Sequence, residues 1–240
     1  MSSRIIVLAI LVAGILLLSL FVSSQIVIPA ELKPLGVFYI KQSMYGNYSA
    51  KSPEAVTAIV WDYRGIDTLF ETLVLFLAIV GGIAVFEKEI KGPIVQVGLT
   101  DLSKTSTKIV VVLIAVVSAS IALHGHLTPG GGFQGGSTLA VATLLMIPVF
   151  GYGALLTKGI TSTKLVLLRG LALTGIGIVA ILPVIRGFEV ASNTSFYPYE
   201  IQGILTSGSL FLYNLLEYVA VGVGFTAVFL YLSIEEGEVR

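Results

Sequence analysis

The chain has 240 residues, of which 55% are hydrophobic and only 12% charged, and its formal net charge is zero. This composition is typical of a membrane protein and not of a soluble domain, and the balanced charge gives no support for nucleic-acid binding. The chain has no cysteine, which excludes a disulfide framework, a thiolate metal site and cysteine-ligated iron–sulfur clusters.

Six continuous apolar stretches approach the roughly 20 residues that a helix needs to cross a bilayer core of about 30 Å. They are residues 5–22, 66–86, 109–123, 137–156, 165–185 and 208–232. We expect the first to be a transmembrane helix and not a signal segment, because its apolar run is longer than a usual signal core. Lipid offers no partners for free backbone groups. The sequence therefore predicts an all-α, polytopic membrane protein with about six transmembrane helices.

Lysine and arginine set the expected orientation. With the N-terminus inside, the inner segments hold eight basic residues and the outer segments three. The inner set is Arg4, Lys88, Lys91, Lys104, Lys108, Lys158, Lys164 and Arg240, and the outer set is Lys33, Lys41 and Lys51. Because basic residues accumulate on the cytoplasmic side, we predict a cell-membrane protein with both termini cytoplasmic.

The outer segment after the first helix, residues 23–63, is long enough to contain structure of its own. Ser52 and Pro53 are typical of a helix start, and we expect a short helix over 53–61 that lies on the membrane. Trp61 would then belong to the interfacial aromatic belt. Asn193, on a later outer loop, begins an N-glycosylation pattern that is common by chance.

Three carboxylates stand inside apolar runs, namely Asp67, Glu71 and Glu217. A charge at a helix centre costs about 2.5–3.5 kcal/mol, so each requires a reason. Together with His124 and His126 at the outer end of the third helix, they suggest the hypothesis of a proton or sodium route through the outer half of the chain.

Alternatives remain open for each of these groups. Asp67 lies three residues after Arg64 and can simply pair with it. Glu217 can instead pair with Arg169, with Arg186 or with a partner chain. The two histidines can have a structural hydrogen-bonding role. We predict no metal site, because no third ligand stands near them.

Between the third and fourth apolar stretches, residues 127–136, directly after the two histidines, contain five glycines: Gly130, Gly131, Gly132, Gly135 and Gly136. The sequence predicts a break there, with Ser137 capping the helix that follows, and with close packing or direct ion contact as the purpose of the glycines. The spacing also matches G-x-G-x-x-G, but it follows a helix and not a strand, so we do not predict nucleotide binding. Pro148 predicts a kink further along. The chain divides into a two-helix part (1–90), a linker (91–106) and a four-helix part (107–240).

The glycine segment resembles the signature of the B subunit of Mrp-type multisubunit sodium/proton antiporters, and this resemblance covers about residues 105–232. Residues 59–71 are similar to the C-terminal end of the large A subunit of the same antiporters. The matching positions there are Asp62, Arg64, Gly65, Asp67, Thr68, Leu69 and Glu71, whereas Phe70 departs from the pattern. A fusion of both pieces resembles the membrane modules of archaeal sulfane sulfur reductase and hydrogenase complexes.

The resemblance implies a non-redox membrane subunit of an ion-pumping respiratory complex that contributes to sodium/proton translocation. It implies contact with the lipid bilayer and with other antiporter-like membrane subunits. It also implies peripheral iron–sulfur redox subunits as partners, and sodium ions and protons as the transported ions. For this chain itself we expect no catalytic site and no cofactor. Two alternatives are a subunit of a free-standing antiporter and a purely structural subunit that seals such a complex.

Overall fold

The computed structural model describes residues 3–25, 31–86 and 99–233. The chain divides into two units, residues 1–38 and 39–240. The first unit contains the apolar helix α1 (Ser3–Gln25), and α2 (Pro34–Met44) begins in the first unit and ends in the second. Helix α2 confirms that the long segment after the first helix has structure of its own.

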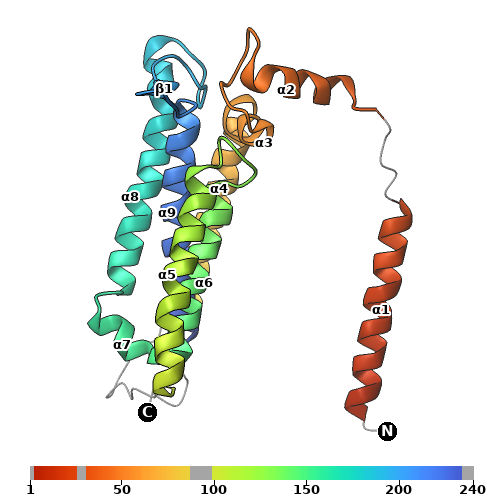
Figure 1. Cartoon of the computed structure of the whole chain (residues 1–240), viewed down its shortest axis with the longest axis vertical. Helices are drawn as coiled ribbons and strands as arrows, with labels where there is room; N and C mark the ends of the chain where they lie inside the picture. The colour runs from red at the N-terminus through yellow and green to blue at the C-terminus, as the bar shows by residue number, and fades with distance from the viewer. Residues whose placement is uncertain (1–2, 26–30, 87–98, 234–240) are drawn as a thin grey trace. The chain divides into compact units, whose positions relative to one another are not determined.

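The second unit is built almost entirely of helices (Figure 1). They are α3 (Ala55–Ala58), the π-helix η1 (Ile59–Tyr63), α4 (Gly65–Phe86), α5 (Asp101–Leu123), α6 (Gly132–Phe150), α7 (Tyr152–Thr157), α8 (Ser162–Ile181), the 3-10 helix η2 (Leu182–Arg186) and α9 (Ser209–Leu232). The strands β1 (Glu200–Ile201) and β2 (Ile204–Leu205) form a small antiparallel hairpin before α9.

Five helices within the described residues are long and apolar enough to cross a membrane, namely 65–85, 101–123, 132–150, 162–186 and 209–232. Helix α1 has 23 residues, and its segment Leu11–Ser24 is apolar as well. The prediction of an all-α, polytopic membrane protein is confirmed. The expected orientation stays a prediction, and Lys88, Lys91 and Arg240, on which it partly depends, lie outside the described residues.

Helix α9 is the centre of the bundle, because it packs against α4, α5, α6 and α8. Its first turns carry the buried residues Leu210 and Tyr213. The indole of Trp61 stacks on the Tyr213 ring with a centroid distance of 4.4 Å, and Trp61 is only 2% exposed. The prediction that Trp61 belongs to the interfacial aromatic belt is therefore wrong: this side chain is part of the core.

The structure also differs from the helix expected over residues 53–61, since α3 ends at Ala58 and the π-helix η1 follows it. Helix α3 begins at Ala55, and its cap is the Glu54 carboxylate, which accepts a 2.5 Å hydrogen bond from the Thr57 N–H. The Ser52 hydroxyl instead donates to the His126 carbonyl at 2.6 Å. Ser52 therefore does not cap the helix, because its hydroxyl binds the distant His126 carbonyl instead.

Helix α6 begins earlier than the sequence indicates. It starts at Gly132, inside the glycine segment, so Ser137 lies within the helix and is not its cap. The preceding Gly131 has φ +143°, a conformation that L side chains rarely adopt. Helix α6 contains Pro148 and ends at Phe150, where Gly151 (φ +81°) separates it from α7. The fourth apolar stretch is therefore two helices.

The connection between η2 and α9 is held by Asn193, which is 9% exposed. Its side-chain Nδ2 donates to the carbonyls of Ala50 and Ser207 at 2.7 and 3.0 Å, and its Oδ1 accepts from the Ser209 N–H at 2.9 Å. Every polar atom of this amide is therefore used in the fold. The Asn193 side chain thus has a structural role, and a glycan on its amide nitrogen would break these hydrogen bonds.

Candidate functional site

A polar pocket of about 180 Å³ lies where the glycine segment meets α4 and α9. Two of the predicted carboxylates, Glu71 from α4 and Glu217 from α9, line this same pocket. Gly130 and Gly131 line it as well. The other lining residues are Val56, Thr57, Val60, Trp61, Thr68, Phe133, Gln134 and Asn214. The structure thus brings together residues that are up to 161 positions apart in the chain.

The start of α6 is capped by side chains of α9. The Gly132 N–H donates to Asn214 Oδ1 at 3.2 Å, and the Phe133 N–H donates to a carboxylate oxygen of Glu217 at 3.1 Å. A helix N-terminus carries a partial positive charge, which stabilises a nearby anion. Glu217 is therefore held by the dipole of α6. In the described part of the chain, neither Arg169 nor Arg186 forms an ion pair with it.

Asp67 lies outside the polar pocket. Arg64 donates to one Asp67 oxygen from Nε at 2.8 Å and also from Nη2, and both side chains are about 60% exposed. The local pairing of Asp67 with Arg64, one of the two open alternatives, is present. An exposed ion pair of this kind contributes little to stability.

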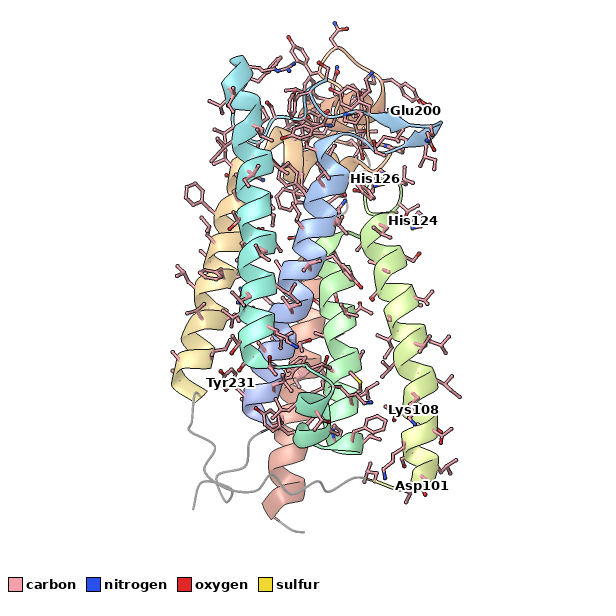
Figure 2. The ribbon with its side chains drawn as sticks, turned by 90° about the vertical axis from the view of Figure 1, so that its left-hand side faces the viewer. Asp101, Lys108, His124, His126, Glu200 and Tyr231 are labelled. Atoms are coloured by element: carbon pink, nitrogen blue, oxygen red, sulfur yellow. The ribbon has the colours of Figure 1, made fainter. Side chains whose placement is uncertain are left out.

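The two histidines also lie outside the pocket, at the same end of the bundle as the β1–β2 hairpin (Figure 2). His124 is exposed, and its Nδ1 lies 2.9 Å from the Ser120 carbonyl of the last turn of α5. His126 is 3% exposed, its Nε2 lies 2.9 Å from the Leu205 carbonyl, and burial lowers the pKa of its imidazole. These contacts favour the structural alternative for both residues.

The glycines divide into two groups. Gly130 and Gly131 line the pocket, whereas Gly132, Gly135 and Gly136 bring helices into close contact. A Cβ at Gly135 would lie 2.7 Å from the Ser118 carbonyl oxygen of α5, and one at Gly136 would lie 2.8 Å from the Tyr218 carbonyl oxygen of α9. Close packing, one of the two expected purposes, is thus present at Gly132, Gly135 and Gly136, whereas direct ion contact stays a prediction for Gly130 and Gly131.

Sequence reasoning missed Asn214 as a residue of the pocket, and it missed Asp62 as a buried carboxylate that does not line the pocket. Asn214 is 1% exposed. It stands three positions before Glu217, and this spacing, which puts both polar side chains on one helix face, is visible in the sequence. The Asp62 carboxylate accepts a 2.7 Å hydrogen bond from the Asn193 N–H. Burial raises the pKa of Asp62 to about 6, although this hydrogen bond acts in the opposite direction.

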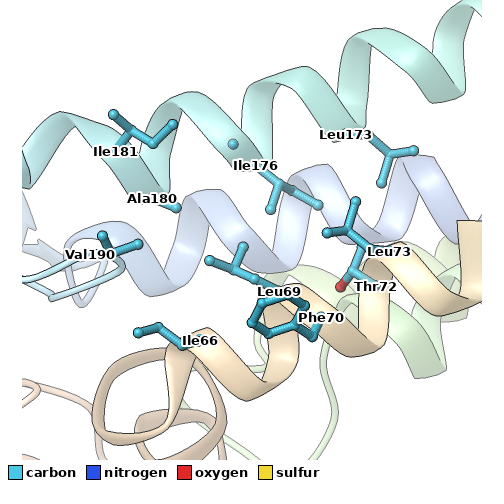
Figure 3. A pocket seen from close by; sticks show the side chains of 11 residues that line it. Ile66, Leu69, Phe70, Thr72, Leu73, Leu173, Ile176, Ala180, Ile181 and Val190 are labelled. Carbon is cyan, nitrogen blue, oxygen red and sulfur yellow. The ribbon is translucent and has the colours of Figure 1, made fainter.

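A larger cavity of about 360 Å³ lies between α4 and α8, and Figure 3 shows its side chains. Its lining is apolar apart from Thr72, whose hydroxyl donates to the Thr68 carbonyl within α4 at 2.8 Å. No ionisable side chain lines this larger cavity, so the smaller polar pocket is the better candidate for an ion site. Within the described residues, no group of three or more histidines or carboxylates could hold a metal ion.

The family model described as "Domain related to MnhB subunit of Na+/H+ antiporter" matches residues 102–227, which is more than half of the chain. The chain belongs to this family. The MnhB-related domain comprises α5 to α8 and most of α9, so it supplies the glycine loop, Asn214 and Glu217. Glu71, Trp61 and Thr68 come from the segment that precedes it. The polar pocket therefore forms where the MnhB-related domain meets this preceding segment.

Among known proteins, the chain is 32% identical over 117 residues to the uncharacterized protein MJ1307 of Methanocaldococcus jannaschii, a match that covers 41% of this chain and 45% of that protein. The chain thus matches less than half the length of this relative. It is similar, with a TM-score of 0.73 and 28% identity, to a chain of the membrane-bound sulfane sulfur reductase, an archaeal respiratory membrane complex; the similarity covers 98% of this chain and 100% of that one.

A second structural similarity is to the Mrp complex from Dietzia sp. DQ12-45-1b, with a TM-score of 0.67. The identity is 18%, and the match covers 98% of this chain but only 26% of the other. At this identity the comparison shows a shared fold alone. Both similarities span the MnhB-related domain and the segment before it, and with the five apolar helices they make the chain a multi-pass membrane protein.

Proposed function

We propose that this chain is a non-redox membrane subunit of a multisubunit ion-pumping respiratory complex, in which it contributes to sodium/proton translocation by an Mrp-type antiporter module. The observation that carries the proposal is the polar pocket with Glu71 and Glu217 on facing helices. Carboxylates are costly within apolar helices and commonly mark ion pathways there. The protein's own role is to offer a titratable, partly hydrated site, while redox chemistry belongs to other subunits.

The structural similarity to a complete chain of the sulfane sulfur reductase supports this context over a free-standing antiporter. In the Dietzia Mrp complex the comparable fold occupies about a quarter of a much longer chain. We therefore propose other antiporter-like membrane subunits as direct partners, peripheral iron–sulfur subunits as the redox arm, and sodium ions and protons as cargo.

The test is ion transport by the purified complex in vesicles, with Glu217→Gln and Glu71→Gln made singly. We expect each variant to assemble and to lose most of the coupled transport, because an amide cannot release a proton or carry the negative charge that attracts a cation. Glu200→Gln is the matched control, since Glu200 is an exposed carboxylate in β1 outside the pocket. Asp67→Asn tests whether the ion pair with Arg64 also has a transport role.

Full transport in both pocket variants would refute the ion-path proposal. It would favour the alternative of a structural subunit that seals the complex, for which the hydrogen bond from Phe133 to Glu217 already provides a structural reason. An amide oxygen at position 217 would still accept that hydrogen bond, so Glu217→Gln separates the two roles of this side chain.

A further inference from the structure

Arg169 is a buried charge in the middle of the helix bundle. It lies seven residues after the start of α8, about 10 Å along the helix, and is 5% exposed. Its side chain points into the bundle, toward α4. Its Nη2 donates to the Leu75 carbonyl of α4 at 3.3 Å, and its guanidinium carbon lies 4.9 Å from the centre of the Phe76 ring.

Helix α9 makes room for this side chain at Gly224. A Cβ there would lie 3.1 Å from Nε and 3.3 Å from Cζ of Arg169. The guanidinium therefore fills the seam between α4, α8 and α9. A cavity of only about 20 Å³ remains beside it, which is about the space of one water molecule.

No carboxylate neutralises this charge within the described residues, where the two ion pairs are Arg64–Asp67 and Lys104–Asp101. The Nε of Arg169 also has no hydrogen-bond partner there. An unpaired buried charge is costly, and an apolar side chain of similar volume would hold the helices together equally well. Packing therefore does not account for a positive charge at this position.

The location of Arg169 relative to the polar pocket gives the charge a role. Gly224, which touches the guanidinium, lies seven residues beyond Glu217 on α9, about 10 Å along the helix. The two helices that carry Glu71 and Glu217 are the same helices that enclose Arg169. A cation that left the pocket along this seam, away from the glycine segment, would meet the guanidinium directly.

We propose that Arg169 is an electrostatic barrier that closes the seam between α4, α8 and α9 to cations. The chain then supplies only the half of the ion path that includes the Glu71–Glu217 pocket, and the ion leaves this pocket sideways, toward another subunit. This inference rests on the proposed function of the pocket. It assigns a specificity-determining role to a residue that touches neither of the pocket carboxylates.

The experiment measures passive proton and sodium leak through vesicles that contain the complete complex, without electron donor and under an imposed potassium diffusion potential. Arg169→Met removes the charge and retains the volume, so we expect it to assemble normally. Even while a cation is still about 10 Å away, near Glu217, a unit charge raises its energy enough to slow its passage about tenfold at an effective dielectric constant of about 20. We expect Arg169→Met to raise the leak by about this factor or more.

Three further variants make the result specific. Arg169→Lys keeps the charge and should leave the vesicles as tight as the wild type. Arg186→Met is the matched control, because Arg186 is exposed at the end of η2, with its guanidinium 5.0 Å from the Phe196 ring centre. Adding Glu217→Gln to Arg169→Met should abolish the leak. If Arg169→Met does not assemble, Arg169→Gln, which keeps a donor for the Leu75 carbonyl, takes its place.

Vesicles that stay tight with an assembled Arg169→Met or Arg169→Gln complex would overturn the barrier, and so would an equal leak in Arg169→Lys. The two proposals fail in different ways. Tight vesicles together with loss of driven transport in Glu217→Gln would remove only the barrier. Intact driven transport in both Glu217→Gln and Glu71→Gln would remove the ion path itself, whatever Arg169 does.

Discussion

Single polar residues hold the segment before α4 against the later part of the second unit, from residue 125 onward. The Asp62 carboxylate binds the Asn193 N–H, the Thr57 hydroxyl donates to the Gly125 carbonyl at 2.5 Å, and the Ser52 hydroxyl donates to the His126 carbonyl. Each bond joins the segment before α4 to a residue at least 68 positions later. Buried polar groups of this kind are costly to leave unpaired, so they fix one arrangement of the chain.

Asp62 makes the stability of the protein depend on pH. Its pKa is raised from 3.8 to about 6 by burial, so the folded state favours the protonated carboxyl group. The sign follows from this direction: the contribution of Asp62 to stability is complete below about pH 4 and is lost as the pH rises through about 6. We predict that Asp62→Asn, which stays uncharged and still offers an oxygen to Asn193, removes this dependence.

At pH 8 the Asp62→Asn variant should be more stable than the wild type, by at most about 3 kcal/mol, and near pH 4 the two should agree. Thermal unfolding in detergent between pH 4 and 8 measures the difference. Parallel pH profiles for the two proteins would contradict a raised pKa of Asp62 in the folded state.

At the scale of helices, the small residues of α6 decide how closely it approaches its neighbours. A Cβ at Gly136 would lie 2.8 Å from both the Tyr218 carbonyl oxygen and the Val221 Cβ, and 2.9 Å from the Gly222 nitrogen. Two of these three atoms belong to the backbone of α9, which cannot move without displacing the helix. We predict that Gly136→Ala lowers the free energy of unfolding by about 1–3 kcal/mol or more.

Gly81→Ala is the matched control, because Gly81 also lies within a long helix, α4, and a Cβ there would meet nothing within 4 Å. Alanine is a better helix former than glycine, so this change should be neutral or stabilising by up to about 1 kcal/mol. Unfolding temperatures of both variants in the same detergent test the pair. Equal effects would mean that backbone propensity, and not the α6–α9 contact, governs the glycine segment.

The same elements show what sequence alone could predict. Five long apolar helices were predictable because each hydrophobic run is itself the signal. The start of α6 was not, because its capping groups, Asn214 and Glu217, lie more than 80 residues away in the chain. Trp61 was assigned to the interface on residue type, whereas the stack on Tyr213 depends on tertiary contact.

The candidate site divides in the same way. Glu71 and Glu217 could be selected from the sequence because a carboxylate within an apolar run stands out. The sequence does not show that Glu71 and Glu217 share one pocket, because they lie on different helices that meet only in the folded chain. It also does not show that Asp67 pairs with Arg64 or that the histidines contact backbone carbonyls. The sequence offered Arg169 only as an alternative partner of Glu217, and its burial against α4 and α9 depends on tertiary contact.

For the whole molecule, the second unit contains both the MnhB-related domain and the described segment before it, since residues 39–240 form one unit. The predicted division at residues 90 and 107 stays a prediction, and residues 87–98 lie outside the described part of the chain. The polar pocket requires both parts at once. A complex that kept only the MnhB-related domain would need another chain to supply the Glu71 side of the pocket.

The orientation of this unit in the membrane can be tested directly, because the wild-type chain has no cysteine. His124 and His126 lie at one end of the bundle, and Lys108 lies toward the other (Figure 2). The distribution of lysine and arginine predicts that the histidine end is outside. Thr128→Cys and Thr157→Cys place single, exposed thiols after α5 and at the end of α7, on the two sides of α6.

A membrane-impermeant maleimide applied to intact cells should label the Thr128→Cys variant and leave Thr157→Cys unlabelled until the membrane is opened. Both substitutions are at exposed positions and leave every lysine and arginine in place, so the charge distribution that sets the orientation is unchanged. The reverse labelling pattern would place the polar pocket nearer the cytoplasm. It would also place Arg169 on the outer side of the pocket, and the ion path would then have to be entered from within the cell.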